Sequence, residues 1–531
     1  MTAGAPSATI NHRNTAAGKS SAEAGPIHRG AGLRARLEHP LPWLMLLAIA
    51  LRIWAAATPG FHHPDAIYQY LEPANRLLTG EGIITWEWRV GMRSWLLPAL
   101  FAVPLAIGQA LDPDGALPMI LPRLATGAAS LGTVWAAWDI GRRHSMTMGM
   151  LAGVVAATWF EIVFFAAETL AEPLAVAALV PVAALVTAPR PTSAKIVLAG
   201  ALLAFAALAR PQYAPAGAAM LLVAWWPDLT PARFDRRRWA LLIAGALGVA
   251  TISGLVDASQ GLTPFAWIAE NVRQNIVHDV AARYGTLPPL AYVAWFMAVW
   301  RWWMIPATIG IWFGWRQSPA LLAAAAITLV VHSLIPHKEY RFVLLAFTAL
   351  TLLSALGWGQ LIGLARARWS SALGQGIAAG VFAMWALASV VLAQGAMAPG
   401  QRKLNTDGWK TFVHLRIDPA VCGVALVQPA SFADLPGIVA LRRGIPVSMF
   451  WTGDPAASGI DPWATAARWD ATFNRIVTLS NGALHVPAGY SVEHCERQWS
   501  NRMCILARPG TCSASETSPF LLNGVMARTG F

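Results

Sequence analysis

A carboxylate follows two histidines and a proline in the segment His62–Asp65, a few residues after the first long apolar run. Pro64 restrains the backbone of the residue before it. A carboxylate that is partly removed from water at the mouth of a helix bundle is suited to act as a general base on a hydroxyl. The alternative for any single acid is a solvated loop carboxylate. We take Asp65 as the candidate catalytic base, with His63 and Glu72 positioning substrate beside it.

A second cluster, His337–Arg341 (HKEYR), places three potential cations within five residues. Such groups can hold a phosphate or pyrophosphate, although Lys and Arg side chains at a membrane boundary also extend toward water without binding anything. We predict that His337, Lys338 and Arg341 bind a phosphate. Arg210, which interrupts an apolar run, is a further candidate that could instead pair with a buried glutamate.

Three acids, Glu161, Glu168 and Glu172, lie in or beside an apolar segment (FAAETLAEPLAV at its end). Burial would raise their pKa and force them to pair with other groups. The alternative is an acid at a helix end, since Glu172 precedes a proline as at many helix starts.

Aromatic and charged residues follow Asp65 in the same loop, where Trp86 and Trp88 flank Glu87. A tryptophan here could stack on a sugar ring or belong to the aromatic belt of a membrane boundary. We expect Trp86, Glu87 and Arg93, together with Tyr284 of a later loop, to position substrate.

Cofactor signatures are missing from the sequence. GxGxxG and GxxxxGK[ST] do not occur, so nucleotide binding of those kinds has no support. A lone aspartate is not a ligand set, and the expected cofactor and metal content is none. The formal charge of +12 is read as an orientation signal of membrane loops, and no nucleic-acid partner is expected.

The elements that must position these residues are membrane helices. Of the 531 residues, 56% are hydrophobic and 12% charged, about half the charge of an average soluble domain, while 26 Trp and 19 Phe argue against disorder. We predict an all-α polytopic protein with 11 to 13 transmembrane helices in a lipid bilayer. The eleven expected spans are about 40–58, 94–111, 119–139, 146–166, 169–187, 195–226, 239–256, 290–314, 320–336, 342–364 and 373–397.

An odd number of spans places the N-terminus in the cytoplasm and the C-terminus outside. Residues 1–40 are predicted to be a disordered cytoplasmic tail, residues 41–397 the membrane domain, and 59–93, 257–289 and 337–341 its outer loops. Arg142 and Arg143 fall outside on this count, against the positive-inside rule. Either they are an exception, or the interrupted run 195–226 is two spans and another span is miscounted.

The segment after Asp65 carries apolar residues at helical spacing, including Ile67, Tyr70, Leu71 and Ala74. This spacing predicts an amphipathic helix on the membrane surface.

Residues 398–531 have ordinary polarity and are predicted to form a small α/β domain outside the membrane. Strands are expected near 423–427, 446–450, 475–479 and 503–507, with a helix near 463–469. All four cysteines of the chain are here, a pattern that favours disulfides in an oxidising compartment over a zinc site. The candidates are Cys422, Cys495, Cys504 and Cys512, with their pairing left open.

Two of these motifs resemble a known family. HPDAIYQYLEPANRLLTGEGIITWEW followed by GMRSWLLP, and HKEYRF at 337–342, are similar to motifs of glycosyltransferase family 22, the mannosyltransferases that build GPI anchors and N-glycan precursors. A weaker match to the family is the segment that contains Asn275 and ends in Tyr284-Gly285-Thr286. The sequence departs from the family in having Ala66 where a second acid stands, and Leu287 where a histidine does.

The resemblance implies a GT-C fold and transfer of a hexose, mannose, from a polyprenyl-phosphate-linked donor to a hydroxyl of a glycan or glycolipid acceptor. The anomeric carbon would be inverted, with Asp65 as the base. The Ala-, Gly-, Trp- and Arg-rich composition suggests a bacterial inner membrane, with the active site and C-terminal domain in the periplasm. Alternatives are a transporter or flippase of lipid-linked sugars, or a non-catalytic binder of them.

Overall fold

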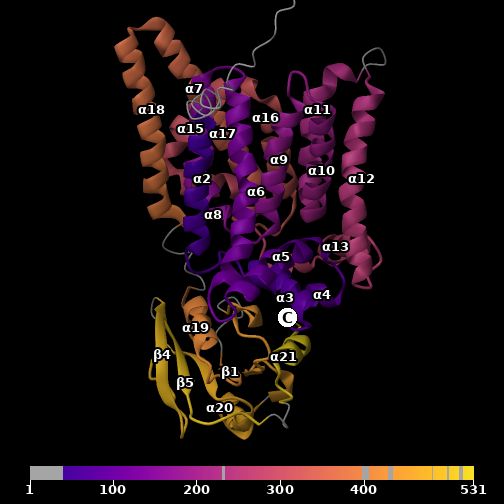
Figure 1. Cartoon of the computed structure of the whole chain (residues 1–531), viewed down its shortest axis with the longest axis vertical. Helices are drawn as coiled ribbons and strands as arrows, with labels where there is room; N and C mark the ends of the chain where they lie inside the picture. Colours follow the sequence, from indigo (N-terminus) through magenta and orange to yellow (C-terminus); the bar gives the residue numbers. More distant parts are fainter. Residues whose placement is uncertain are drawn as a thin grey trace, which may run out of the picture. The chain divides into compact units, whose positions relative to one another are not determined.

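The computed structural model describes residues 40–229, 234–397, 406–428, 435–457, 459–480, 482–498, 501–513 and 518–530. Residues 43–531 form one compact unit, in which long helices are followed by a small sheet (Figure 1). The expected fold class, a helical membrane protein with a small α/β C-terminal part, is confirmed. The predicted tail lies outside the described residues, except that the first helix begins at Pro40.

Four of the described helices are long and apolar enough to cross a membrane: Pro40–Ala57, Arg236–Ser259, Tyr340–Arg368 and Ser371–Gly395. The helices of the bundle are α2 (Pro40–Ala57), α6 (Leu117–Arg142), α7 (Met146–Thr158), α8 (Phe160–Phe165), α9 (Ala171–Val186), α10 (Ser193–Ala209), α11 (Ala214–Trp225), α12 (Arg236–Ser259), α14 (Ala291–Trp300), α15 (Met304–Gly314), α16 (Pro319–Leu334), α17 (Leu344–Arg368) and α18 (Ser371–Leu392).

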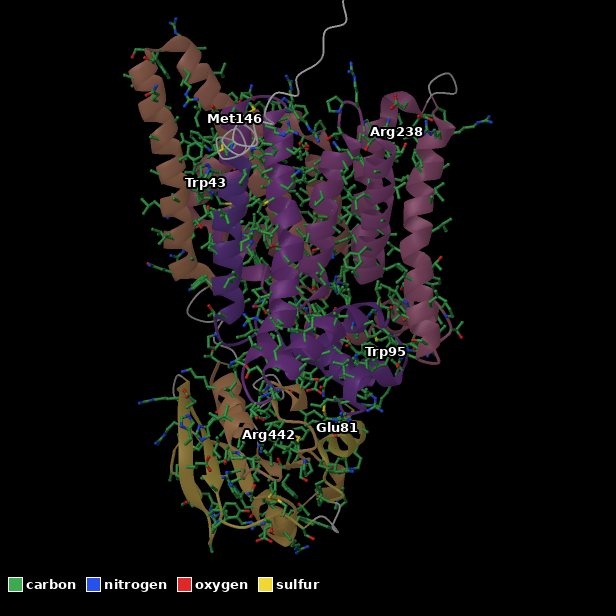
Figure 2. All side chains as sticks on the ribbon, viewed as in Figure 1. Trp43, Glu81, Trp95, Met146, Arg238 and Arg442 are labelled. Carbon is green, nitrogen blue, oxygen red and sulfur yellow. A yellow bond between two sulfur atoms is a disulfide. The ribbon has the colours of Figure 1, made fainter. Side chains whose placement is uncertain are left out.

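The loops of the bundle gather at two opposite faces. At one, which we call the basic face, Arg143 donates to the carbonyl of Ala184 (2.6 Å) and Arg238 to the carbonyl of Val186 (3.3 Å). Figure 2 shows Met146 and Arg238 at this end and Glu81 and Trp95 at the other, which we call the site face. Arg142 and Arg143 therefore share a face with Arg238, and the placement that the span count gave them is wrong.

That placement is wrong because the expected span 94–111 was counted as a crossing. This segment does not cross from one face of the bundle to the other. Helix α5 (Leu96–Leu111) begins where the hydroxyl of Ser94 (3.0 Å) and the backbone N–H of Trp95 (2.8 Å) donate to Asp257, in the last turn of α12. Just beyond its other end, the carbonyl of Pro113 accepts a hydrogen bond from Arg416 of the C-terminal part (2.7 Å). Both ends of α5 thus lie on the site face (Figure 1). Apolar composition alone does not distinguish such a helix from a span.

The interrupted run 195–226 is two helices, α10 and α11, joined by a single turn at Pro211–Tyr213. Proline lacks the N–H that would continue the helix. The indole of Trp225 at the end of α11 donates to the carbonyl of Val186 (3.1 Å), which returns the chain to the basic face. The expected span 94–111 is lost, and the expected span 195–226 becomes two. The total of eleven is therefore unchanged, and it stays a prediction.

The amphipathic segment of the first loop (residues 59–93) forms the π-helix η1 (Ala66–Leu71) and α3 (Glu72–Thr79), followed by α4 (Trp86–Arg89). Most of its apolar side chains are buried inside the protein, although Leu78 is exposed. Ile67, Tyr70, Leu71 and Ala74 are buried in one hydrophobic core with Phe101 of α5 and the C-terminal sheet. The second loop (residues 257–289) holds α13 (Ala266–Val272), the π-helix η4 (Arg273–Val277) and the short helix η5 (Val280–Tyr284).

The C-terminal part contains α19 (Thr406–Ile417), α20 (Pro462–Arg468), α21 (Leu522–Thr529) and five strands in the order β2-β1-β3-β5-β4. The strands are β1 (Val424–Val427), β2 (Val447–Phe450), β3 (Arg475–Ser480), β4 (Ser491–Gln498) and β5 (Asn501–Ala507). Parallel pairs join β1 to β2 and β3, and antiparallel pairs join β5 to β3 and β4. The four expected strands and the helix are present. Strand β4 was missed, because an edge strand can be as polar as SVEHCERQ.

All four cysteines are paired in the structure. Cys495 and Cys504 link the neighbouring strands β4 and β5, and Cys422 is bonded to Cys512.

Candidate active site

Asp65 begins the first-loop helix on the site face, directly before η1. Its carboxylate accepts a hydrogen bond from Arg341 (Nη2 to Oδ2, 2.5 Å), and its backbone N–H donates to Nδ1 of His63 (3.2 Å). The other ring nitrogen of His63 lies 3.3 Å from Oε2 of Glu339. The side chain of Asp65 is 23% exposed. The structure therefore brings the candidate base from the first loop against the HKEYR cluster, and leaves it open to an incoming group.

Arg341 is the centre of this site. Its Nε donates to Glu339 (2.6 Å), its Nη2 to Asp65, and its Nη1 lies 3.6 Å from Oε1 of Glu172. The residue is 4% exposed. A guanidinium can serve several carboxylates at once because its donors point outward in a fixed, planar fork. Three acids from three separate segments thus meet at one cation.

Arg210 lies behind this pair, at the turn between α10 and α11. Its Nη1 is 3.3 Å from Oε1 of Glu172, and its guanidinium lies 4.4 Å from the ring centre of Phe342. The sequence left open whether Arg210 pairs with a buried glutamate or contacts a phosphate, and the structure shows the pairing.

His337 and Lys338 face different ways. Both ring nitrogens of His337 lie near acceptors, the carbonyl of Gly285 (2.9 Å) and the carboxylate of Glu339 (3.1 Å). The hydrogen bond to Glu339 raises the pKa of His337 despite its partial burial. Lys338 donates to the carbonyls of Ser333 and Ile335 at the end of α16. Phosphate binding by Lys338 stays a prediction, and in this structure its ammonium caps a helix.

The charges of the site keep two of its acids, Asp65 and Glu339, ionised. Burial by itself would raise the pKa of Asp65, but the charges of His63 and Arg341 outweigh it and hold the pKa well below its usual value. For Glu339, burial is likewise outweighed, by the charge of Arg341 and the hydrogen bond from His337, so its pKa is also lowered. Both side chains are carboxylates at neutral pH.

The two loops meet at the rim of this site. The indole of Trp86 donates to the hydroxyl of Tyr284 in the second loop (2.9 Å). Tyr284 in turn lies beside His337, with ring centres 6.2 Å apart. Glu87 and Arg93 form a two-pronged ion pair (2.6 and 3.2 Å) in the first loop. These four predicted positioning residues are near one another, and their contact with a substrate stays a prediction.

Glu72, the sixth predicted positioning residue, is completely buried. One carboxylate oxygen accepts the backbone N–H of Ile83 (2.7 Å) and the other that of Val439 in the C-terminal part (2.9 Å). Burial raises its pKa to about 7, although these hydrogen bonds act in the opposite direction. This environment fits an acid that joins the first loop to the C-terminal part.

Two acids of the site were not in the predicted set. Glu339 lies inside HKEYR, where three of its four neighbours are potential cations. The sequence indicates for Glu172 a buried acid or an acid at a helix start. The signal that could have found both is the cost of an unpaired arginine near a membrane, which requires acids close to Arg341 and Arg210. In the described part of the chain, His, Cys, Asp and Glu side chains form no group of three suited to bind a metal ion.

Comparison with solved structures gives the class of the fold. ArnT from Cupriavidus metallidurans, solved with undecaprenyl phosphate, superposes with a TM-score of 0.58 at 13% identity, over 89% of this chain and 100% of that one. Its apo structure gives a TM-score of 0.55. The protein has the GT-C fold, as the sequence motifs implied.

Comparison of sequences identifies the family. Residues 43–404 match the family model of the Alg9-like mannosyltransferase family, and the chain belongs to that family. GPI mannosyltransferase 3 of Yarrowia lipolytica is 28% identical over 328 residues, 58% of this chain and 61% of that protein. The Drosophila melanogaster protein of the same name is 27% identical over 336 residues, 57% and 54%. The matches thus span between half and two thirds of these relatives.

Proposed function

We propose that this protein is an integral-membrane glycosyltransferase that moves mannose from a polyprenyl-phosphate-linked donor to a hydroxyl of a glycan or glycolipid acceptor. The observation that carries the proposal is the contact between Asp65 and Arg341, which unites the two motifs of the family in one site. Family membership supports the sugar. The likeness to a protein solved with undecaprenyl phosphate supports the lipid.

The geometry suggests how the residues divide the work. The donor phosphate takes a place at Arg341, with Arg210 and His337 nearby, and Asp65 gives up its hydrogen bond to the guanidinium. The acceptor oxygen then attacks the anomeric carbon while the bond from that carbon to the phosphate oxygen breaks. Asp65 takes the proton of the hydroxyl, and the lipid leaves as its phosphate. A single displacement inverts the anomeric carbon, and fixed cations stabilise the charge on the leaving group.

This division of roles makes Asp65 a conditional base. While Arg341 pairs with it, the low pKa makes the carboxylate a weak proton acceptor. A phosphate that engages Arg341 removes this restraint, because less positive charge remains for the aspartate. The base is then strongest when the donor is in place.

Transfer can be tested with membranes that contain the chain, a mannose-labelled polyprenyl phosphate donor and extracted envelope glycolipids. We expect the label to leave the donor for a product that survives mild acid, and Asp65→Asn to abolish this. A flippase would relocate the donor without consuming it, and a binder would leave it unchanged.

We also propose a bacterial inner membrane, with the basic face and N-terminus in the cytoplasm and the site face and C-terminal part in the periplasm. The arginines of the basic face and the disulfides of the C-terminal part support this orientation. In spheroplasts, an impermeant thiol reagent should label Ala488→Cys and not His144→Cys. Labelling of His144→Cys alone would reverse the orientation.

A further inference from the structure

Of the three acids that meet at Arg341, Glu172 is the least exposed. It stands in the first turn of α9, and its side chain is 1% exposed, compared with 23% for Asp65 and 23% for Glu339. Its Oε1 lies 3.3 Å from Arg210 and 3.6 Å from Arg341. Neither carboxylate oxygen accepts a hydrogen bond from any described residue. The carboxylate of Glu172 therefore lies within ion-pair distance of two guanidiniums, with no hydrogen bond to either.

The segment just before α9 contacts the first loop at Ala66. The hydroxyl of Thr169, in the turn before α9, donates to the carbonyl of Ala66 (3.1 Å). Ala66 is the position where the family motif has its second acid, and in this chain it is a fully buried alanine. The segment that leads into α9 and Glu172 thus packs against the position that lacks the acid.

The proposed reaction changes the charge at the phosphate. The donor is a phosphodiester with one negative charge, whereas the lipid phosphate that leaves carries about −1.5 to −2 near pH 7. Two arginines without compensation would bind this product more tightly than the donor, because attraction grows with charge. Turnover would then be limited by release of the product.

A fixed carboxylate beside both arginines corrects this imbalance, because its repulsion also grows with the charge of the phosphate. Asp65 cannot supply the repulsion at the end of the reaction, since it has taken the proton of the acceptor. Glu339 is engaged by two histidines, with His63 at 3.3 Å and His337 at 3.1 Å. Glu172 has no histidine partner among the described residues and lies against both arginines.

We propose that Glu172 promotes release of the product lipid phosphate from the site. It does so by weakening the binding of the product more than the binding of the donor. This inference rests on the proposed function, because it assumes that the phosphate binds at Arg341 and Arg210. Glu172 acts through the two arginines and touches no reacting atom, so it is a positioning residue.

Equilibrium binding tests the idea without turnover. Purified protein in lipid nanodiscs is titrated with undecaprenyl phosphate, with its mannosyl phosphodiester, and with undecaprenol as an uncharged probe. In Glu172→Gln we expect donor affinity to rise roughly tenfold and product affinity roughly thirty- to a hundredfold, because removal of one charge acts in proportion to the charge of the ligand. Undecaprenol affinity should not change. Equal changes for donor and product, or weaker binding of the product, would overturn the proposal.

Two matched variants complete the test. Glu172→Asp keeps the charge and should keep the ratio of the two affinities within about twofold of the wild type. Glu168→Gln removes a buried acid that precedes α9 and lies instead near the backbone N–H of His62 (3.0 Å) and Arg123 (4.0 Å). It should leave that ratio unchanged. A shift of the ratio in Glu168→Gln as large as in Glu172→Gln would contradict a specific role.

The wild type alone provides a measurement that needs no variant to fold. It should bind undecaprenyl phosphate no more tightly than the mannosyl phosphodiester, and product binding more than about tenfold tighter would overturn the inference. If the wild type binds neither charged lipid, the proposed function fails. If it binds both and Glu172→Gln leaves their ratio unchanged, only the role of Glu172 fails.

Discussion

Asp65 and Glu72 are acids of the same loop, yet they occupy opposite kinds of environment. Asp65 is partly exposed and faces charged partners, and its pKa is held well below the usual value. Glu72 is completely buried and accepts only backbone N–H groups, and its pKa is raised to about 7. The comparison teaches that position in the tertiary structure, and not residue type or loop, decides whether the pKa of an acid is lowered or raised.

The largest expected effect belongs to Asp65. Asp65→Asn keeps the shape of the side chain but removes the base, and general-base assistance is worth about 10²–10⁴-fold in rate. Turnover with labelled donor should fall at least a hundredfold, while donor binding does not weaken. Near-normal turnover of Asp65→Asn would show that another residue is the base. Asp65 and Glu72 would then no longer differ in their proposed roles.

Arg341→Lys should have the next largest effect. The charge remains, but a lysine cannot serve Asp65, Glu339 and Glu172 with one planar fork. We expect turnover to fall roughly ten- to a hundredfold with wild-type amounts of folded protein in the membrane. Arg341→Ala is less informative, because unpaired buried acids would also destabilise the fold. Unchanged turnover in Arg341→Lys would remove the arginine from the site.

Glu72 should affect stability more than rate, and its effect depends on pH. Its pKa is about 7 in the folded protein and about 4.3 in an unfolded chain. The folded state therefore binds the proton more tightly, and stability should fall as pH rises from about 4.5 to about 7. Hydrogen exchange at residues 66–79 and 435–441 should speed up across this window. Exchange rates are corrected for their intrinsic pH dependence. If the corrected exchange slows as pH rises, the stabilising role of protonated Glu72 is excluded.

Glu72→Gln provides the control for that prediction. It should remove this part of the pH dependence, and it should cost about 1–3 kcal/mol because one buried N–H loses its acceptor. Turnover of the protein that remains folded should change only a few-fold. A loss as large as that of Asp65→Asn would place Glu72 in the chemistry.

The smallest expected effect is that of Lys338. Its ammonium donates to two carbonyls at the end of α16, and a cation at a helix C-terminus contributes about 0.3–1 kcal/mol. Lys338→Ala should lower thermal stability slightly and turnover less than about threefold. A loss comparable to that of Arg341→Lys would restore Lys338 as a phosphate ligand.

The sequence by itself determined the class of the protein and the motifs that meet in the site. Low charge and long apolar runs required membrane helices, because a backbone in lipid must satisfy its own hydrogen bonds. The motifs around Asp65 and Arg341 led to the family that the comparisons show. The strands β1, β2, β3 and β5 were also predictable from short apolar runs between turns.

Only the tertiary structure decided what each apolar face packs against and which charges meet. The apolar residues of η1 and α3 read equally well as a membrane surface or a protein core, and the C-terminal sheet provides the core. Helix α5 is apolar enough to be a span, but contacts at both its ends keep it on one face. Glu172 and Arg341 are far apart in the chain, so nothing local could pair them. Burial and pairing depend on distant segments, and for this reason they set the roles of the acids.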